Sequence, residues 1–205
     1  MKASLILIIT ISLITIGCNP FLGIYGIKTP KEINEKKIER ISKRFDLPPA
    51  DVFELDTAFY SFLTSHDTAA FKPQIKNHIQ PLQALYFSQT GQLLSYQINC
   101  YAGGFPNITW ERDSIFSVFP PRQQAPIDTL VSVSTQIEYL KPLTHSEKIN
   151  PDNYDYIVFV YWSKFMGRQS RRFLKLVKKN NRLLSENEKI RVVYINNDNF
   201  FIDKW

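Results

Sequence analysis

The chain has 205 residues, of which 44% are apolar and 21% charged, enough for one globular domain with a real core and some additional segments. Its net charge of +6 is concentrated between Lys164 and Arg191, where ten Lys or Arg and two Glu give +8 and leave −2 for the rest. The two cysteines, Cys18 and Cys100, lie in different surroundings and do not indicate an internal disulfide framework. Three histidines and seven scattered glycines leave little material for metal or phosphate sites, so we expect no metal and no cofactor.

Residues 1–17 have the pattern of an export signal peptide. Lys2 supplies the positive charge, residues 5–16 form an apolar run, and Gly17 is a small residue directly before Cys18. The apolar run is shorter than the roughly 20 residues that span a bilayer. We therefore expect a segment that directs export.

The tetrad Thr15-Ile16-Gly17-Cys18 resembles the lipobox of bacterial lipoproteins, although Thr15 stands where Leu is usual. The resemblance implies that Cys18 receives fatty acyl chains such as palmitate and becomes the mature N-terminus, and several chains hold a protein on a membrane. Asn19 replaces the Asp that favours inner-membrane retention in enterobacteria, which indicates the outer membrane, facing the periplasm. The alternative is a cleaved signal with Cys18 as a free thiol.

Residues 18–28 are predicted to form a tether, and residues 29–205 a single domain that begins with helices. Thr29 can cap a helix, with Glu32 completing a capping box, and Pro48-Pro49 ends it. Asp51 to Thr64 is predicted to be a second helix, because Leu55, Phe59, Phe62 and Leu63 lie on one side.

Three histidines lie in polar connections. Ser65-His66-Asp67 has the residue types of a hydrolase triad, but adjacent residues do not face one another, so a polar loop is the preferred interpretation. His78 and His145 lack metal-ligand spacing to other ligand types and are predicted to be solvated.

Residues 82–101 predict a β-hairpin, with Gly91 in the turn. The second run alternates so that Cys100 falls on the apolar face, which favours a buried, inert thiol over a redox role. The long connection over residues 102–126 is rich in aromatics and is predicted to cover the core; exposed, it would form a binding rim. Asp128 then starts a predicted helix that Pro142 ends.

Residues 156–197 read as a βαβ unit. Tyr156 to Trp162 is continuously apolar, as a strand in the middle of a sheet must be. A basic amphipathic helix follows Gly167, and Ile190 to Ile195 returns as a parallel neighbour. The predicted fold class is therefore α/β with three layers. The polar side of the helix, within residues 168–182, carries Arg171, Arg172, Lys175, Lys178, Lys179 and Arg182.

This unit resembles the thioredoxin-like family. Residues 162–169, Trp-Ser-Lys-Phe-Met-Gly-Arg-Gln, are similar to the family's Trp-Ala-x-Trp-Cys-Gly-Pro-Cys, and the positions that carry the resemblance are Trp162, Phe165, Met166, Gly167, Arg168 and Gln169. Met166 and Gln169 stand where the two cysteines would be. Thiol–disulfide exchange needs an attacking thiolate, so we expect the family's activity to be lost.

The chain ends ten residues after Ile195, whereas the family places a hairpin after that strand. The upstream hairpin is similar to the family's, and Pro81 before it resembles the family's cis-proline. We therefore hypothesise a permuted thioredoxin-like sheet in which this hairpin packs beside Tyr156 to Trp162.

Three functions remain open. The leading one is a non-catalytic, lipid-anchored envelope protein whose degenerate thioredoxin-like domain binds or scaffolds an unknown partner. The second is a thiol oxidoreductase, or a mixed-disulfide partner, that uses Cys100. The third is contact of the basic helix with anionic lipid or lipopolysaccharide, where each Lys or Arg contributes about 1 kcal/mol. Nucleic acid is not expected as a partner of an exported protein.

Overall fold

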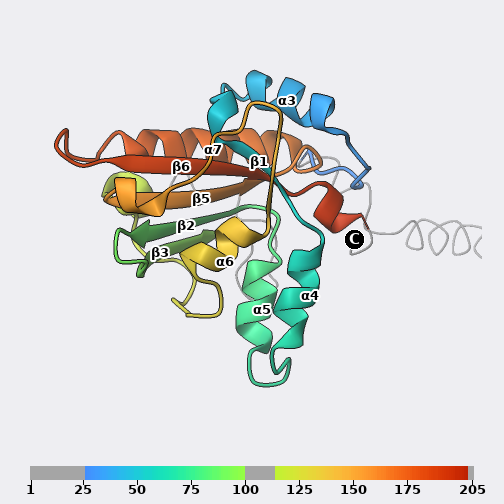
Figure 1. Ribbon diagram of the computed structural model, residues 1–205, viewed down its shortest axis with the longest axis horizontal. Helices are drawn as coiled ribbons and strands as arrows, with labels where there is room; N and C mark the ends of the chain where they lie inside the picture. Colours follow the sequence, from blue (N-terminus) through green and yellow to red (C-terminus); the bar gives the residue numbers. More distant parts are fainter. Residues whose placement is uncertain (1–25, 100–113, 203–205) are drawn as a thin grey trace, which may run out of the picture.

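A computed structural model describes residues 26–99 and 114–202. Its centre is one six-stranded mixed sheet with the strand order β3-β2-β5-β6-β1-β4 (Figure 1). The strands are β1 (Val52–Leu55), β2 (Gln83–Ser88), β3 (Leu93–Ile98), β4 (Leu140–Pro142), β5 (Tyr156–Trp162) and β6 (Ile190–Asn196). The helices are α3 (Glu35–Arg44), α4 (Ala58–Ser65), α5 (Lys72–His78), α6 (Val133–Glu138) and α7 (Gly167–Asn181). The predicted α/β class is confirmed.

Strand β5 lies inside the sheet, as its apolar sequence predicts. Six of its seven residues are buried, β6 runs parallel to it on one side, and β2 runs antiparallel on the other. The pairs Val158↔Val192 and Tyr86↔Val158 fix the two registers. The predicted strand–helix–strand order and the position of the hairpin beside β5 are therefore both confirmed.

The N-terminal helices differ from the prediction. Helix α3 begins at Glu35, because the side chain of Asn34, and not that of Thr29, caps it by accepting a hydrogen bond from the Lys37 N–H. The predicted helix Asp51–Thr64 is wrong in its first part, where the chain forms β1, parallel to β6, before α4 begins. Glu54 and Leu55 are thus strand residues.

The helix predicted from Asp128 is also shorter than expected. Ser132 caps α6 by accepting a hydrogen bond from the Thr135 N–H, and the helix ends at Glu138. Leu140 to Pro142 then forms β4, antiparallel to β1 at the edge of the sheet. Pro142 suits this place because an edge strand can lose one backbone donor.

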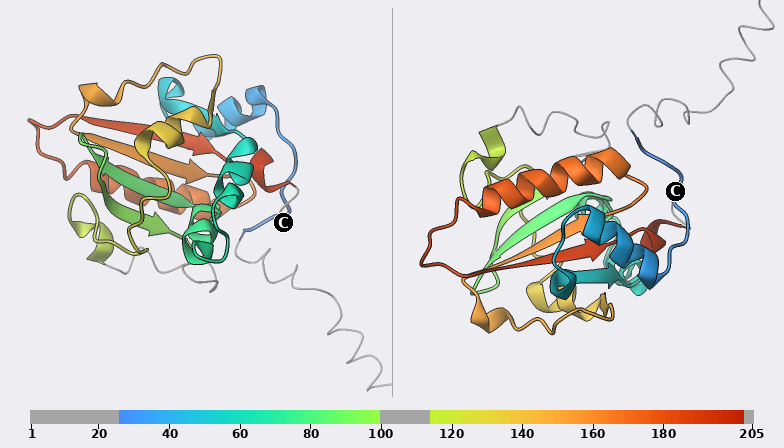
Figure 2. Two further views of the ribbon diagram at one scale, coloured as in Figure 1. Left: turned by 60° about the horizontal axis from the view of Figure 1, so that its bottom comes forward. Right: turned by 90° about the horizontal axis from the view of Figure 1, so that it is seen from above.

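Helices cover both faces of the sheet (Figure 2). On one face lies α7, with the segment around Ser114–Ser117, whose Phe116 packs on Phe173 of α7 at 6.4 Å between ring centroids. On the other face lies α6, where the hydroxyl of Tyr161 donates a hydrogen bond to Gln136. The predicted core-covering role of residues 102–126 is confirmed for their described part. Across the described ranges, no helix is both long and apolar enough to cross a bilayer.

Candidate functional site

The segment that resembles a redox motif forms the turn from β5 to α7. Asp198, which follows β6, holds this turn by accepting hydrogen bonds from the backbone N–H groups of Lys164 (2.6 Å) and Phe165 (3.1 Å). The amide of Asn196 donates a third, at 2.7 Å. Ser170 ties the first turn of α7 back to Ser163 by donating to its carbonyl oxygen at 2.6 Å. The turn is therefore fixed from both sides.

The two side chains that replace the family's cysteines are buried. Met166 is 1% exposed and Gln169 is 7% exposed. A partner could not reach either side chain without displacing part of the protein. Positions 166 and 169 are thus part of the packed core and do not line an open cleft.

The N-terminal segment of residues 26–33 packs against this turn. The Lys28 N–H donates to the Phe165 carbonyl at 2.8 Å, and Ile27 and Ile33 are both buried. Asn199 fixes the other end of the segment through a pair of 2.9 Å hydrogen bonds, one to the N–H and one to the carbonyl of Ile33. Residues 26–28, which were predicted to belong to the lipid-anchored tether of residues 18–28, therefore pack against the folded domain.

Pro81 lies near the turn, but not as a cis-proline. It is buried before β2, and its carbonyl oxygen accepts a 3.1 Å hydrogen bond from the amide of Asn197. Among the described residues the cis peptide bond joins Phe119 and Pro120, so the prediction of a cis bond at Pro81 is wrong.

Burial shifts the ionisation of the groups at the turn. The pKa of Asp198 is raised, mainly because its carboxylate is removed from water, although the three hydrogen bonds and the charge of Lys164 act in the opposite direction. The pKa of Lys164 is lowered, first by burial and then by the positive charge of Lys37. The turn therefore contains a carboxylate and an ammonium group that are both partly desolvated.

His78 is buried and not solvated, so that prediction is wrong. Its Nε2 lies 3.0 Å from the Asp128 carboxylate, and its Nδ1 lies 3.2 Å from the Tyr96 hydroxyl, which donates to Gln83 at 2.8 Å. The ring stacks on Tyr96 with centroids 5.1 Å apart. Burial, followed by the negative charge of Asp128, raises the pKa of Tyr96 well above its ordinary value. This network joins α5, the hairpin and the loop before α6. Because the network is buried, a substrate could not reach it.

The other polar candidates form no catalytic group. Ser65 and His66 each bond to the Phe62 carbonyl, whereas Asp67 accepts from the Ala69 N–H, and no hydrogen bond joins the three side chains of this described loop. His145 is exposed. No set of three or more His, Cys, Asp or Glu within residues 26–99 and 114–202 could hold a metal ion.

The basic face of α7 is partly used inside the protein. The ammonium group of Lys178 donates to the Phe45 carbonyl and to the Asp46 carboxylate, both at 3.1 Å, and the Arg171 guanidinium lies 5.8 Å from the centre of the Phe45 ring. These contacts attach the end of α3 to α7. The exposed members of the face are Arg171, Arg172, Lys175, Lys179 and Arg182.

Two of the predicted site residues lie outside the described residues. These are Cys18, the expected site of lipid attachment, and Cys100, the candidate thiol. Both remain predictions.

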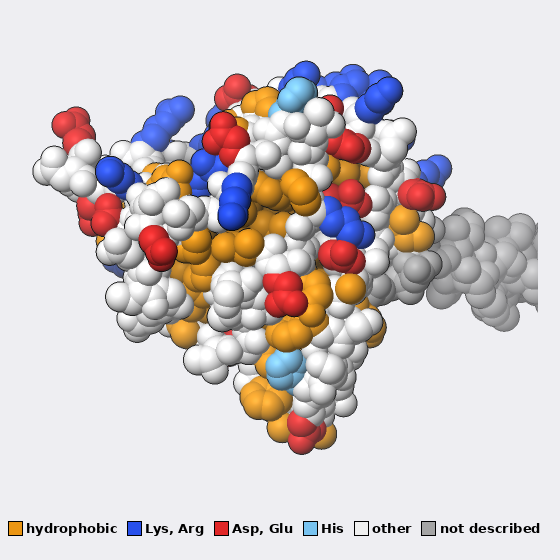
Figure 3. All heavy atoms as spheres, viewed as in Figure 1, with side chains coloured by type: hydrophobic (Ala, Val, Ile, Leu, Met, Phe, Trp, Pro, Cys, Tyr) orange, Lys and Arg blue, Asp and Glu red, His pale blue; other side chains and the backbone are white. Residues whose placement is uncertain are grey.

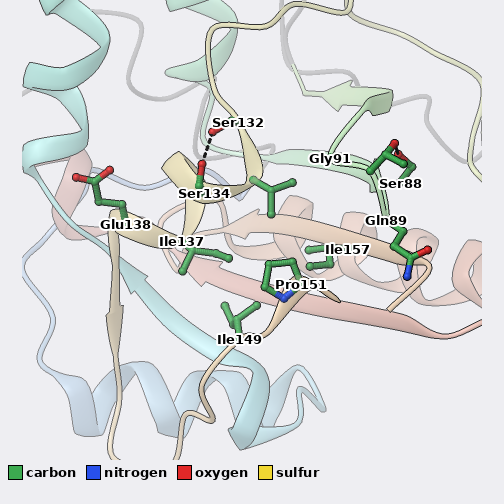
Figure 4. A pocket seen from close by; sticks show the side chains of 12 residues that line it. Ser88, Gln89, Gly91, Ser132, Ser134, Ile137, Glu138, Ile149, Pro151 and Ile157 are labelled. Atoms are coloured by element: carbon green, nitrogen blue, oxygen red, sulfur yellow. Dashed lines mark hydrogen bonds between the residues drawn. The ribbon is translucent and has the colours of Figure 1, made fainter. Parts of the chain in front are cut away.

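A groove on the α6 face was not predicted from the sequence. It has a volume of about 670 Å³ and lies between the β2–β3 turn, α6 and residues 149–151. Apolar side chains reach the surface on this face, with charged side chains around them (Figure 3). Ile137, Ile149, Pro151 and Ile157 converge at its floor, and Ser88 and Gln89 approach from the hairpin (Figure 4). The lining residues come from four separate parts of the chain, so no local motif could have revealed it.

The rim of this groove is polar but almost uncharged. Ser132 and Ser134 are joined by a 2.8 Å hydrogen bond between their hydroxyl groups, and Thr90 lies on the hairpin side. The one charged lining residue, Glu138, points away from the apolar floor (Figure 4). An apolar floor with a few convergent polar groups is the usual composition of a binding site.

Comparisons with protein-family models, with curated proteins and with solved structures returned no match.

Proposed function

We propose that this chain is a non-catalytic, lipid-anchored envelope protein whose α/β domain is a degenerate, permuted thioredoxin-like fold that binds a partner protein. The observation that carries the proposal is the filled β5–α7 turn, where Met166 is 1% exposed and residues 26–28 lie over the turn. A thioredoxin-like enzyme needs an accessible thiolate at this place.

The strand order supports the thioredoxin-like part of this proposal. The family's hairpin runs antiparallel beside the first strand of its βαβ unit, and here β2 runs antiparallel beside β5, while β6 is parallel on the other side. Because the hairpin precedes β5 in this chain, its order would be permuted. Strands β1 and β4 extend the sheet beyond β6.

The groove on the α6 face is the docking place that we assign to the partner. Its floor of Ile137, Ile149 and Ile157 fits an apolar side chain, and its hydroxyl and amide rim fits the backbone of a peptide segment. The scarcity of charge in the groove favours an uncharged partner segment, because burying an unpaired charge there would be costly.

Crosslinking in intact cells tests the partner-binding role. A photo-reactive amino acid replacing Ile137 in the groove should give a discrete protein adduct, whereas the same group replacing the exposed Lys148 should not. Purification of the Ile137 adduct should identify one partner. Identical patterns from both positions, or no adduct from Ile137, would contradict the docking place.

Two further measurements test the rest of the proposal. Labelling cells with a palmitate analogue should mark the protein, and Cys18→Ser should remove the label. Disulfide reductase or peroxidase activity that persists in the Cys100→Ser variant would show that the domain is catalytic.

A further inference from the structure

Four lysines from separate parts of the chain meet at the carboxyl end of β5. Lys28 and Lys31 come from the N-terminal segment, and Lys164 comes from the β5–α7 turn; with Thr29, Phe165 and Asp198 they line a pocket of about 380 Å³. Lys37 of α3 lies next to Lys164, close enough to lower the pKa of its ammonium group. The fold thus places like charges together, which costs free energy unless an anion joins them.

Within residues 26–99 and 114–202, Asp198 is the one carboxylate that lines this lysine pocket. Among the described residues, none of the ammonium groups of Lys28, Lys31, Lys37 and Lys164 forms an ion pair within 4.0 Å. Asp198 is 1% exposed, and its oxygens already accept from the N–H groups of Lys164 and Phe165 and from the Asn196 amide. The positive charge that faces the pocket therefore exceeds the negative charge.

We infer that the lysine pocket binds a phosphoryl group. A phosphomonoester carries a charge of about −1.5 to −2 at neutral pH and offers three strong acceptor oxygens. Lysine ammonium groups match it, because each is a compact charge with three donors on a flexible stem. Thr29 also lines the pocket, and a threonine hydroxyl is a neutral donor. A ligand with a single carboxylate carries less negative charge than a phosphomonoester. It would leave more of the positive charge of the lysines uncompensated.

This inference does not depend on the partner-binding proposal, since the pocket and the groove have no lining residue in common. The phosphoryl group could belong to a lipid headgroup or to a soluble phosphate. The test therefore needs one arm for each source.

The first arm titrates the full chain with inorganic phosphate at constant ionic strength, with chloride as the replaced anion, and follows unfolding temperature and binding heat. The pocket variant is Lys31→Gln with Lys164→Gln. The control variant, Lys72→Gln with Lys148→Gln, removes the same charge from exposed lysines outside the pocket. In the pocket variant, the removal of each charge-assisted hydrogen bond should weaken phosphate binding about tenfold, whereas the control should bind like the parent.

The second arm measures binding to phosphatidylcholine vesicles with and without phosphatidic acid. Because residues 1–25 are identical in the parent, the pocket variant and the control, any membrane binding by those residues cancels in the comparison. A loss of the phosphatidic acid effect in the pocket variant alone identifies a lipid phosphate, and a phosphate effect in the first arm alone identifies a soluble one.

Either result supports the inference. It is overturned if the pocket variant and the control respond alike in both arms, or if phosphate and phosphatidic acid have no effect on the parent protein. Lys28→Gln serves as a second pocket variant, because its side chain is exposed and its replacement should leave folding unchanged.

Discussion

The backbone N–H of Lys28 donates a 2.8 Å hydrogen bond to the carbonyl oxygen of Phe165. This contact joins the N-terminal segment to the one turn of the protein that resembles a redox motif. It shows that residues 26–28 are part of the folded domain. The same contact brings Lys28 and Lys31 to the lysine pocket, so the closure of the turn and the proposed anion site have one structural origin.

Glycine is required at position 167 by the close approach of the N-terminal segment. Gly167 has φ of +46°, and a Cβ there would lie 2.7 Å from the carbonyl oxygen of Gly26. We expect Gly167→Ala to lower the free energy of unfolding by about 2–3 kcal/mol, combining backbone strain with the clash. Gly91→Ala is the control, because Gly91 has φ of +77° but nothing within 4 Å of a Cβ, and should cost about 1 kcal/mol. Equal losses in urea unfolding would contradict the close packing of the segment.

His78 should contribute strongly to stability through its buried network. His78→Ala leaves Asp128 and the hydroxyl of Tyr96 without this partner and creates a cavity, so we expect a loss of about 3 kcal/mol. His145→Ala, at an exposed position, should change stability by less than about 0.5 kcal/mol. Chemical denaturation of both variants measures the difference. A solvated His78 would make the two variants indistinguishable.

Asp198 should make stability depend on pH. Its pKa is raised in the folded protein above the value of about 3.9 in an unfolded chain, so the folded state holds the proton more tightly. The contribution of Asp198 to the free energy of unfolding is therefore fully present below pH 4. It declines as the pH rises through the pKa that Asp198 has in the folded protein. The excess stability of the parent over Asp198→Asn should consequently decrease as the pH rises above about 4. Urea unfolding of both proteins across this pH range measures the direction of the change. A stability difference between parent and variant that grows with pH would contradict a raised pKa of Asp198.

Two neighbouring lysines on α7 should behave differently. Lys178 donates to the Phe45 carbonyl and the Asp46 carboxylate, whereas Lys179 is exposed. Lys178→Met should lower the free energy of unfolding by about 1 kcal/mol, because it removes a charged donor to a carbonyl oxygen. The same change at Lys179 should have little effect. If Lys178→Met is equally harmless, the contact between α3 and α7 does not stabilise the fold.

The sequence predicted best those helices, strands and turns whose residue pattern depends only on the element itself. Tyr156 to Trp162 had to be an inner strand because all seven of its residues are apolar or aromatic, and the structure has the same bounds. The helix from Gly167 and the hairpin turn at Gly91 were found for similar local reasons. Strand β1 was missed because its Leu55 continues into Phe59 and Leu63 of α4 at helical spacing, while its pairing with β6 is not local.

Long-range contacts account for the other missed features. His78 is buried by Asp128, which is 50 residues away in the chain, and no spacing rule connects the two. Segment 26–33 covers a turn more than 130 residues later, so neither the burial of Met166 nor the lysine pocket could be predicted. The absence of thiols at positions 166 and 169, by contrast, is visible in the sequence itself, and the loss of redox chemistry stays a prediction from it.

The accessibility of position 166 tests the central claim most directly. In a background of Cys18→Ser and Cys100→Ser, the variants Met166→Cys and Lys175→Cys each carry a single thiol whose rate of alkylation can be followed under native conditions. We predict that Lys175→Cys reacts as fast as the unfolded protein, and that Met166→Cys reacts about 100-fold more slowly or less, because its exposure requires local unfolding. Equal rates for the two thiols would show an open turn and would contradict the account of a closed, non-catalytic domain.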